Sequence, residues 1–342
     1  MSDSTPVITQ FAPGKLMLAG EWAVLEPGNP CIVLAVNEGV TAKIVTSNKI
    51  IIDSPDVGLR NISLTSSLSP AEKQSFIFVR FAIKITLNYL RERCVVTRTF
   101  RLSIRSSLTY SGLGSSAASV VAVTKAILEF HDFDVFSKKA KQIIFKLSSL
   151  AHFQAQGFSG SCFDVAASTY AGTLVYKRFD PEWLSGELAR CESVSKILGH
   201  TWPGLEIKPI ELPEEMRVVS RFAGREASTR ELVAKMGDFK KKNFPGYQAI
   251  CNEIALVVNK LVHAIEVCDK QVCAKRAYDK EKILSLVREN RVLLKKLAEQ
   301  SKINLETPEM KKLCDSAERC GGAAKFSGAG GGDCVISICF SP

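Results

Sequence analysis

The sequence lacks several patterns that would assign it quickly to a class of protein. It contains no Cys-x-x-Cys pair, and its four histidines keep no ligand spacing with the eleven cysteines, which argues against a zinc site. Met1–Gln10 has no basic stretch followed by an apolar core, so no secretory signal is expected. The most apolar long window, Ile254–Val267, is interrupted by polar and charged side chains, which excludes a membrane span there.

Cysteine and charge narrow the class further. An odd number of cysteines without a framework is typical of reduced thiols, mostly buried, in a cytoplasmic protein. The net charge of +10 is spread along the chain, and the longest basic run is only Lys240–Lys242. Most of the 18 phenylalanines lie within apolar patterns, so no stacking platform for bases is evident. These features favour small polyanionic ligands over nucleic acid or a membrane surface.

The length of 342 residues predicts two domains, and the mixture of strands and helices without a regular βαβ alternation predicts an α+β fold. The segment Phe179–Gly204, punctuated by Pro, Trp and Gly, is interpreted as a linker. Alternating or apolar runs predict strands at Val7–Phe11, Lys15–Leu18, Cys31–Val36, Val40–Val45, Lys49–Asp53, Thr99–Ile104, Gly172–Tyr176, Arg217–Phe222 and Asp333–Phe340. Helical spacing predicts helices from the Ser69 cap to about Arg91 and at Ser115–His131, Ile143–Gln156, Tyr247–Val267 and Lys280–Gln300.

Ser111–Ala118 reads Ser-Gly-Leu-Gly-Ser-Ser-Ala-Ala and opens directly into a predicted helix. Bare backbone before a helix N-terminus exposes unpaired N–H groups and a partial positive charge, which suits phosphate. Ser115 or Ser116 would either cap the helix or hold Mg²⁺ by its hydroxyl. The Gly-x-Gly-x-x-Ala pattern fits a dinucleotide fingerprint only weakly, because polar residues separate it from the preceding strand. No Gly-x-x-x-x-Gly-Lys-Ser/Thr loop is present.

A second glycine loop precedes the last predicted strand. Four of the seven residues in Ser327–Asp333 are glycine, a density that is costly to order and seldom serves only as a hairpin. It is a good second phosphate site. Two such loops indicate a ligand with several phosphates, or two phosphorylated ligands that meet.

Two charged residues are candidates for catalysis. Lys15 follows a Pro-Gly turn, so it either reaches phosphate oxygens or an acidic partner, or is a solvated turn lysine. Asp164 ends a glycine- and serine-rich turn, so it either caps a helix or faces a cation, for which Lys15 is the candidate.

Another polar segment follows the predicted strand at 217–222. Ser228 and Thr229 stand among Arg221, Arg225 and Arg230 ahead of a helix. They either bind an anionic substrate or simply cap that helix.

Taken together, these segments resemble the GHMP kinases. The three motifs of that family are matched by Pro13–Glu21, Gly112–Ala118 and Gly328–Gly332. Within the family, the segments 160–166, 224–229 and 327–334 are similar to the variants of phosphomevalonate kinases. Mevalonate kinases usually carry Ser-Gly-Ile-Asp at the segment that ends in Asp164, which this chain does not.

The resemblance implies an N-terminal ATP-binding domain over 1–185, containing a left-handed βαβ unit, and a ferredoxin-like C-terminal domain over 205–342. It implies transfer of phosphate from ATP, with Mg²⁺, to (R)-5-phosphomevalonate, by a monomer or homodimer. Mevalonate as the acceptor, or a catalytically silent ligand sensor on the same fold, are the alternatives.

The same resemblance assigns roles to residues. Lys15 and Asp164 would be the active-site pair, and Ser116 would contact Mg²⁺. ATP phosphates would lie on Ser111, Gly112, Leu113, Gly114, Ser115 and Ser116. Substrate would contact Lys15, Ser161, Ser228, Thr229, Gly328, Ala329 and Gly330.

Overall fold

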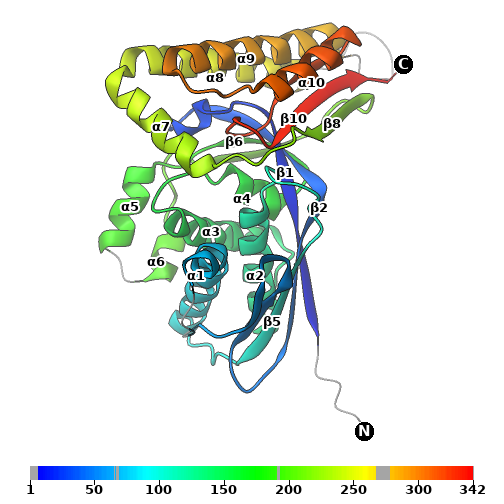
Figure 1. Cartoon of the computed structure of the whole chain (residues 1–342). Coiled ribbons are helices and arrows are strands. Elements are labelled where there is room, and N and C mark those ends of the chain that lie inside the picture. Colours follow the sequence, from blue (N-terminus) through cyan, green and yellow to red (C-terminus); the bar gives the residue numbers. More distant parts are fainter. Residues whose placement is uncertain (1–6, 65, 67–68, 191–192, 267–277, 342) are drawn as a thin grey trace.

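The fold is known from a computed structural model, which describes residues 7–64, 66, 69–190, 193–266 and 278–341. In these residues a seven-stranded sheet and a three-stranded sheet are both accompanied by helices (Figure 1). The α+β architecture agrees with the fold class expected from the sequence.

The large sheet has the strand order β4-β3-β5-β2-β6-β7, with β1 paired to β2. Strands β3 and β5 are parallel neighbours, and the chain passes between them through β4 and helix α1, which forms a βαβ unit. The strands are β1 Ile8–Ala19, β2 Pro30–Thr46, β3 Ile51–Ser54, β4 Leu59–Ile62, β5 Phe100–Ser106, β6 Thr173–Lys177 and β7 Glu206–Ile210.

Helices of the N-terminal half lie mostly against one side of this sheet (Figure 1). Ser69 begins α1 with a complete capping box, in which its hydroxyl accepts from Glu72 N–H and the Glu72 carboxylate accepts from Ser69 N–H. The helices are α1 Pro70–Glu92, α2 Ser115–Phe130, α3 Lys138–Ala155, α4 Phe163–Tyr170, α5 Pro181–Arg190 and α6 Val194–Gly199, with short 3₁₀ turns η1 Ala23–Leu25 and η2 Pro55–Val57.

The small sheet is antiparallel, with β10 between β8 and β9. The long helices α8 and α9 and the shorter α10 lie above it in Figure 1, while α7 extends over the N-terminal half. The elements are β8 Met216–Phe222, α7 Thr229–Lys242, α8 Phe244–Glu266, α9 Lys280–Ser301, α10 Pro308–Arg319, β9 Ala323–Phe326 and β10 Cys334–Phe340.

Two hydrophobic cores share strand β1. Met17 packs into the core beneath α1–α4, whereas Leu16 and Leu18 pack into the core beneath α8 and α9. Side chains alternate between the two faces of a strand, so β1 is buried on both sides. The two halves of the chain therefore pack against each other through this strand.

The linker interpretation of 179–204 is wrong. The segment forms α5 and α6, and Phe179, Leu184 and Trp202 are buried in the N-terminal core. Pro181 begins α5 and Gly199 ends α6, whereas Gly186 lies within α5, so these residues do not form an open connection. Strand β7 then pairs with β6 in the large sheet, although the proposed second domain begins at residue 205.

Candidate active site

The segment Ser111–Ser116, predicted from the sequence to bind phosphate and called the phosphate loop from here on, leads directly into α2, which begins at Ser115. Its N-cap is Gly114, at a φ of +86°, and no side chain caps the helix. The alternative in which Ser115 or Ser116 serves as an ordinary cap is therefore wrong. The first N–H groups of α2 are left for water or an anionic ligand.

Lys15 lies between the two glycine loops. Its Nζ donates to the Gly112 carbonyl at 2.6 Å, and a Cβ added to Gly328 would be 3.7 Å from the same nitrogen. The side chain also runs along Gly114, where a Cβ would approach Lys15 Cγ to 3.0 Å. Lys15 is only 7% exposed, so the solvated-turn interpretation is wrong.

The second glycine loop is held against both halves of the molecule. Ser327 Oγ accepts a hydrogen bond from Met17 N–H at 2.8 Å, and Gly331 N–H donates to the Leu305 carbonyl at 2.7 Å. Asp333 at its end accepts a hydrogen bond from Ser111 Oγ at 2.5 Å. The structure thus brings together the two loops that the sequence separates by more than 200 residues.

Asp164 lies in the first turn of α4, and its Oδ2 is 3.7 Å from His152 Nε2. That distance is too long for a hydrogen bond. His152 is buried, its Nδ1 has no partner among the described residues, and burial lowers its pKa while Asp164 opposes the shift. A direct Lys15–Asp164 ion pair, expected from the sequence, is not formed within 4 Å; Lys15 Nζ instead lies 5.6 Å from the ring centroid of Phe163.

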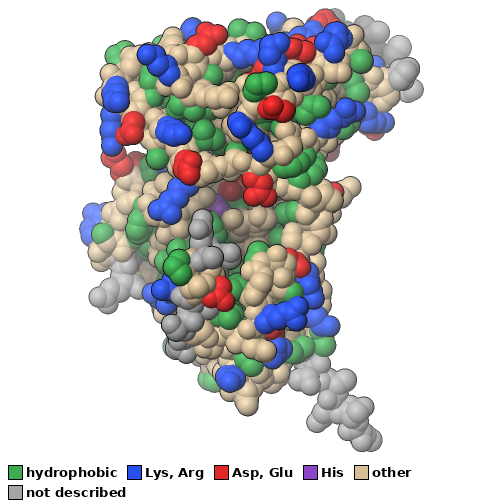
Figure 2. Space-filling model, in the orientation of Figure 1, with side chains coloured by type: hydrophobic (Ala, Val, Ile, Leu, Met, Phe, Trp, Pro, Cys, Tyr) green, Lys and Arg blue, Asp and Glu red, His purple; other side chains and the backbone are tan. Residues whose placement is uncertain are grey.

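A cavity of about 580 Å³ lies between α5 and α7. It is lined by Arg178 and by the Phe158–Gly160 turn that leads to Ser161. Arg178 is 7% exposed; its Nη1 donates to the Leu25 carbonyl at 2.7 Å, while its buried Nε has no partner in the described chain. Figure 2 shows a hollow between the upper, C-terminal layer and the lower part of the molecule.

A buried ion pair ties the first motif to the strand before the second glycine loop. Glu21 and Lys325 are fully buried and in direct contact. Burial raises the pKa of Glu21 and lowers that of Lys325, and each partner opposes the other's shift. Lys325 Nζ also donates to the Phe326 carbonyl at 2.7 Å.

The remaining predicted substrate residues have different surroundings. Ser161 is buried, and its carbonyl accepts a hydrogen bond from Tyr176 Oη at 2.5 Å. Ser228 caps α7 by accepting from Glu231 N–H, which confirms the capping interpretation, while Thr229 is exposed. Gly328, Ala329 and Gly330 lie in the second glycine loop, as the sequence requires. The substrate roles of all these residues stay predictions.

The residues around the loop suit a phosphate-bound magnesium ion. The Ser116 hydroxyl is half-buried in the first turn of α2 and makes no hydrogen bond to another described residue. Helix α2 contacts α4, which carries Asp164. Mg²⁺ prefers oxygen ligands and usually keeps water and substrate phosphate in its shell, so one hydroxyl and one carboxylate are a sufficient protein contribution.

Comparison with known proteins decides the family. The model described as "GHMP kinases N terminal domain" matches residues 79–172, and "GHMP kinases C terminal" matches residues 279–342. The chain belongs to the GHMP kinase family. None of the described helices of this kinase is long and apolar enough to cross a membrane.

Individual relatives of this GHMP kinase cover nearly its whole length. It is 29% identical to a phosphomevalonate kinase of a Streptomyces species, over 99% of this chain and 91% of that protein. It is also 29% identical to a mevalonate kinase of Methanocaldococcus jannaschii, over 95% and 90%. The crystal structure of Streptococcus pneumoniae phosphomevalonate kinase with phosphomevalonate and AMPPNP is 25% identical, with a TM-score of 0.82 over 98% and 93% of the chains.

Three polar residues near the site of this kinase were not predicted from the sequence. His152 lies among apolar residues of a predicted helix, and Arg178 directly follows Lys177; neither belongs to a motif, and both are buried in the structure. Asp333 was read as the end of the glycine loop, but its partner Ser111 is 222 residues away. Arg178 stands beside Lys177 just after a predicted strand, so no signal in the sequence distinguished it from an ordinary charged residue.

Proposed function

We propose that this protein transfers the γ-phosphoryl group of Mg-ATP to (R)-5-phosphomevalonate. The observation that carries the proposal is the state of its buried basic side chains. Four lysine and arginine side chains are buried in the described chain: Lys15, Arg178, Arg291 and Lys325. Arg291 and Lys325 are paired with carboxylates, but Lys15 and Arg178 have no carboxylate of a described residue within 4 Å.

A buried cation without an anionic partner is costly, and a ligand that carries the missing negative charge removes the cost. Lys15 lies between the two glycine loops, where the phosphoryl group would pass. Arg178 lines the cavity between α5 and α7, where the carboxylate of the acceptor would bind. An acceptor that carries two separate anionic groups matches these two separate cations. The phosphates of ATP would lie at the N-terminus of α2.

The choice between mevalonate and phosphomevalonate as the acceptor depends on the relatives and on the second glycine loop. Lys15 and Arg178 alone suit mevalonate as well as phosphomevalonate, since both carry a carboxylate. The Streptomyces relative and the Streptococcus structure are phosphomevalonate kinases, and the second glycine loop is the second phosphate site predicted from the sequence. The mevalonate kinase relative keeps mevalonate as the second candidate. A silent ligand sensor is disfavoured because Lys15, Asp164 and both glycine loops are present.

The test is release of ADP from ATP with mevalonate, phosphomevalonate and galactose measured side by side, with and without Mg²⁺. Phosphomevalonate should give the highest kcat/KM. Turnover with mevalonate alone would overturn the acceptor assignment, and no turnover with any acceptor would support the sensor.

Arg178→Gln gives a second test of the proposed orientation. It should raise the KM for the acceptor about tenfold or more and leave the KM for ATP within a few-fold, because a charged hydrogen bond to the carboxylate is lost. Arg190→Gln, which removes an exposed arginine bonded to Glu187, is the matched control. Equal effects on both substrates would contradict the placement of the acceptor beside Arg178.

A further inference from the structure

Asp333 contacts three segments around the phosphate loop. Its Oδ1 accepts hydrogen bonds from Ser111 Oγ at 2.5 Å and from Ala227 N–H at 3.1 Å. Its own N–H donates to the Arg225 carbonyl at 2.8 Å, and its carbonyl accepts from Ala223 N–H at 2.7 Å. Asp333 is only 8% exposed. One residue therefore joins the phosphate loop, the segment before α7 and the end of the second glycine loop.

The first glycine of the phosphate loop is packed against this carboxylate. A Cβ on Gly112 would lie 2.6 Å from Asp333 Cβ, closer than such atoms approach, and Gly112 has a φ of +86°. Glycine is thus required here by the contact with Asp333 as well as by the backbone conformation. The loop and Asp333 are fitted to each other before any ligand binds.

The charge of Asp333 opposes the task predicted for the loop. A carboxylate beside a helix N-terminus that binds phosphate repels the ligand. The hydroxyl hydrogen of Ser111 is also donated to Asp333, so the donors left for phosphate are mainly backbone N–H groups. The charge of Asp333 therefore does not help the loop to bind phosphate. Its four hydrogen bonds instead indicate that Asp333 fixes the conformation of the loop.

We propose that Asp333 is a positioning residue that holds Ser111–Ser116 in the conformation that binds nucleotide phosphate. It does so by fixing the loop to the segment 223–227 ahead of α7. The inference rests on the proposed ATP-dependent phosphoryl transfer and is independent of which acceptor is used.

The test compares three variants by the Kd of AMPPNP with Mg²⁺, measured by calorimetry, and by their kcat and KM values. Asp333→Ala should weaken nucleotide binding about tenfold or more, and Ser111→Ala several-fold, because each removes a charge-assisted hydrogen bond. Asp333→Asn keeps an oxygen that accepts from both donors, so its Kd should stay within about threefold of wild type. The KM for ATP should rise more than the KM for the acceptor.

Asp134→Asn is the matched control, because that carboxylate also accepts backbone N–H groups, from Phe136 and Ser137. It follows the far end of α2, which is about 24 Å long. The Kd of the Asp134→Asn variant for AMPPNP should equal that of wild type.

Wild-type nucleotide affinity in Asp333→Ala, or an equal loss in Asp333→Asn and Asp333→Ala, would overturn the proposal. If Asp333→Ala does not fold, Ser111→Ala decides, and an unchanged Kd there overturns it. AMPPNP binding needs no acceptor. If the protein phosphorylated mevalonate but not phosphomevalonate, the proposed acceptor would be wrong, but the Kd values would still test the role of Asp333. A wild-type protein that bound no nucleotide would overturn both.

Discussion

Lys15 combines burial, a short bond to the phosphate loop and closeness to the second glycine loop. Its Nζ has three hydrogens, and one is donated to the Gly112 carbonyl. The other two have no hydrogen-bond partner among the described residues, so in the proposed reaction they would be donated to the phosphoryl group. A cation fixed in this way needs little reorganisation when negative charge moves during transfer.

Lys15→Met should lower kcat on the order of a hundredfold or more while ATP affinity stays within a few-fold, because the charge acts mainly in the transition state. Steady-state kinetics and nucleotide binding measure the two effects. Lys125→Met is a suitable control, since Lys125 also donates to a backbone carbonyl, that of Phe11, but lies ten residues along α2. A nearly unchanged kcat in Lys15→Met would remove Lys15 from the chemistry.

The role of Asp164 can be tested by pH. A phosphate monoester has a second pKa near about 6 and is a competent nucleophile above it, so Asp164 need not act as a base. With phosphomevalonate, kcat/KM should rise through that pKa and then stay flat, and Asp164→Asn should lower the plateau without moving the inflection.

The same experiment needs a second variant because His152 lies beside Asp164. Burial lowers the pKa of His152 from its usual value, so it is neutral over the flat part of the profile. His152→Gln should leave the inflection in place. Displacement of the inflection in Asp164→Asn would show that the carboxylate itself titrates as the base.

Single residues also show how far sequence reasoning reaches. Both glycine loops were predicted from short glycine-rich patterns in the sequence. The active-site role of Lys15 was predicted only from the resemblance to the GHMP kinases, because its own neighbourhood also fitted a solvated turn lysine. Asp333 and Arg178 were not predicted, because their roles depend on partners far away in the chain and on burial. The direct Lys15–Asp164 pair was expected from chemical complementarity alone, and the structure instead places a backbone carbonyl beside the lysine.

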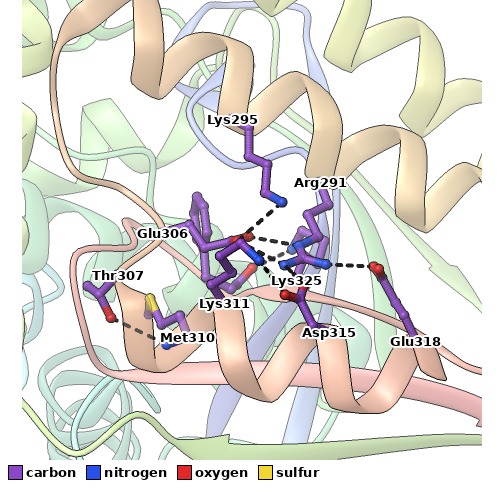
Figure 3. A network of polar contacts seen from close by, with 10 residues as sticks. Arg291, Lys295, Glu306, Thr307, Met310, Lys311, Asp315, Glu318 and Lys325 are labelled. Atoms are coloured by element: carbon purple, nitrogen blue, oxygen red, sulfur yellow. Dashed lines mark hydrogen bonds and ion pairs between the residues drawn. The ribbon is translucent and has the colours of Figure 1, made fainter. Parts of the chain in front are cut away.

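Among the secondary-structure elements, the second glycine loop depends on a network between α9 and α10. Arg291 contacts Glu306, Asp315 and Glu318, with its Nε 2.8 Å from Glu306 Oε2 (Figure 3). The neighbouring Leu305 carbonyl accepts from Gly331 N–H. The ion pairs therefore fix the turn on which the glycine loop rests.

The contribution of this network to the free energy of unfolding should decrease at low pH. Hydrogen bonds from Lys311 and Arg291 lower the pKa of Asp315 from 3.8 to about 2. Because the folded-state pKa is depressed, the stabilisation is fully present above about pH 4 and is lost as the pH falls through 2. Asp315→Asn should be less stable at pH 7 by on the order of 1 kcal/mol, allowing for solvent screening.

Urea unfolding between pH 2 and 7 measures this difference. The gap in free energy of unfolding between wild type and Asp315→Asn should narrow towards pH 2, where about half of the folded wild-type protein carries a protonated Asp315. A gap that stayed constant with pH would mean that the ion pairs are not its source.

Long elements were predicted better than short ones. Helices α1, α2, α8 and α9 begin within three residues of the starts predicted from the sequence, because many apolar positions in them repeat at helical spacing. The separate strands expected at 7–11 and 15–18 are one strand, β1, with a register shift between Pro13 and Lys15. The Pro-Gly pair was read as a break, but it forms an irregularity inside a continuous pairing. Strand β4 and helix α10 were not predicted.

At the scale of the whole molecule, Glu21 and Lys325 connect the N-terminal strands to the C-terminal sheet. Both are completely buried, and 304 residues separate them in the sequence. The Oε2 atom of Glu21 has no partner among the described residues. Removing one charge would leave the other buried and uncompensated.

Glu21→Gln and Lys325→Met should each lower the free energy of unfolding by about 3–5 kcal/mol. The double variant should lose clearly less than the sum of the two, because it leaves no lone charge. Denaturant unfolding of the four proteins completes the cycle. Additive losses would show that the two residues contribute independently.

The shared strand β1 has a consequence for the order in which the protein forms during synthesis. Met17 N–H bonds to Ser327 Oγ, and Leu16 and Leu18 pack in a core whose other members lie mostly beyond residue 210. Contacts so distant along the chain form slowly and late. On the ribosome, β1 can pair with β2 early, but one of its faces stays uncovered until α9, which contacts it, has emerged. The nascent chain therefore carries an exposed apolar surface, and no complete catalytic centre, for most of its translation.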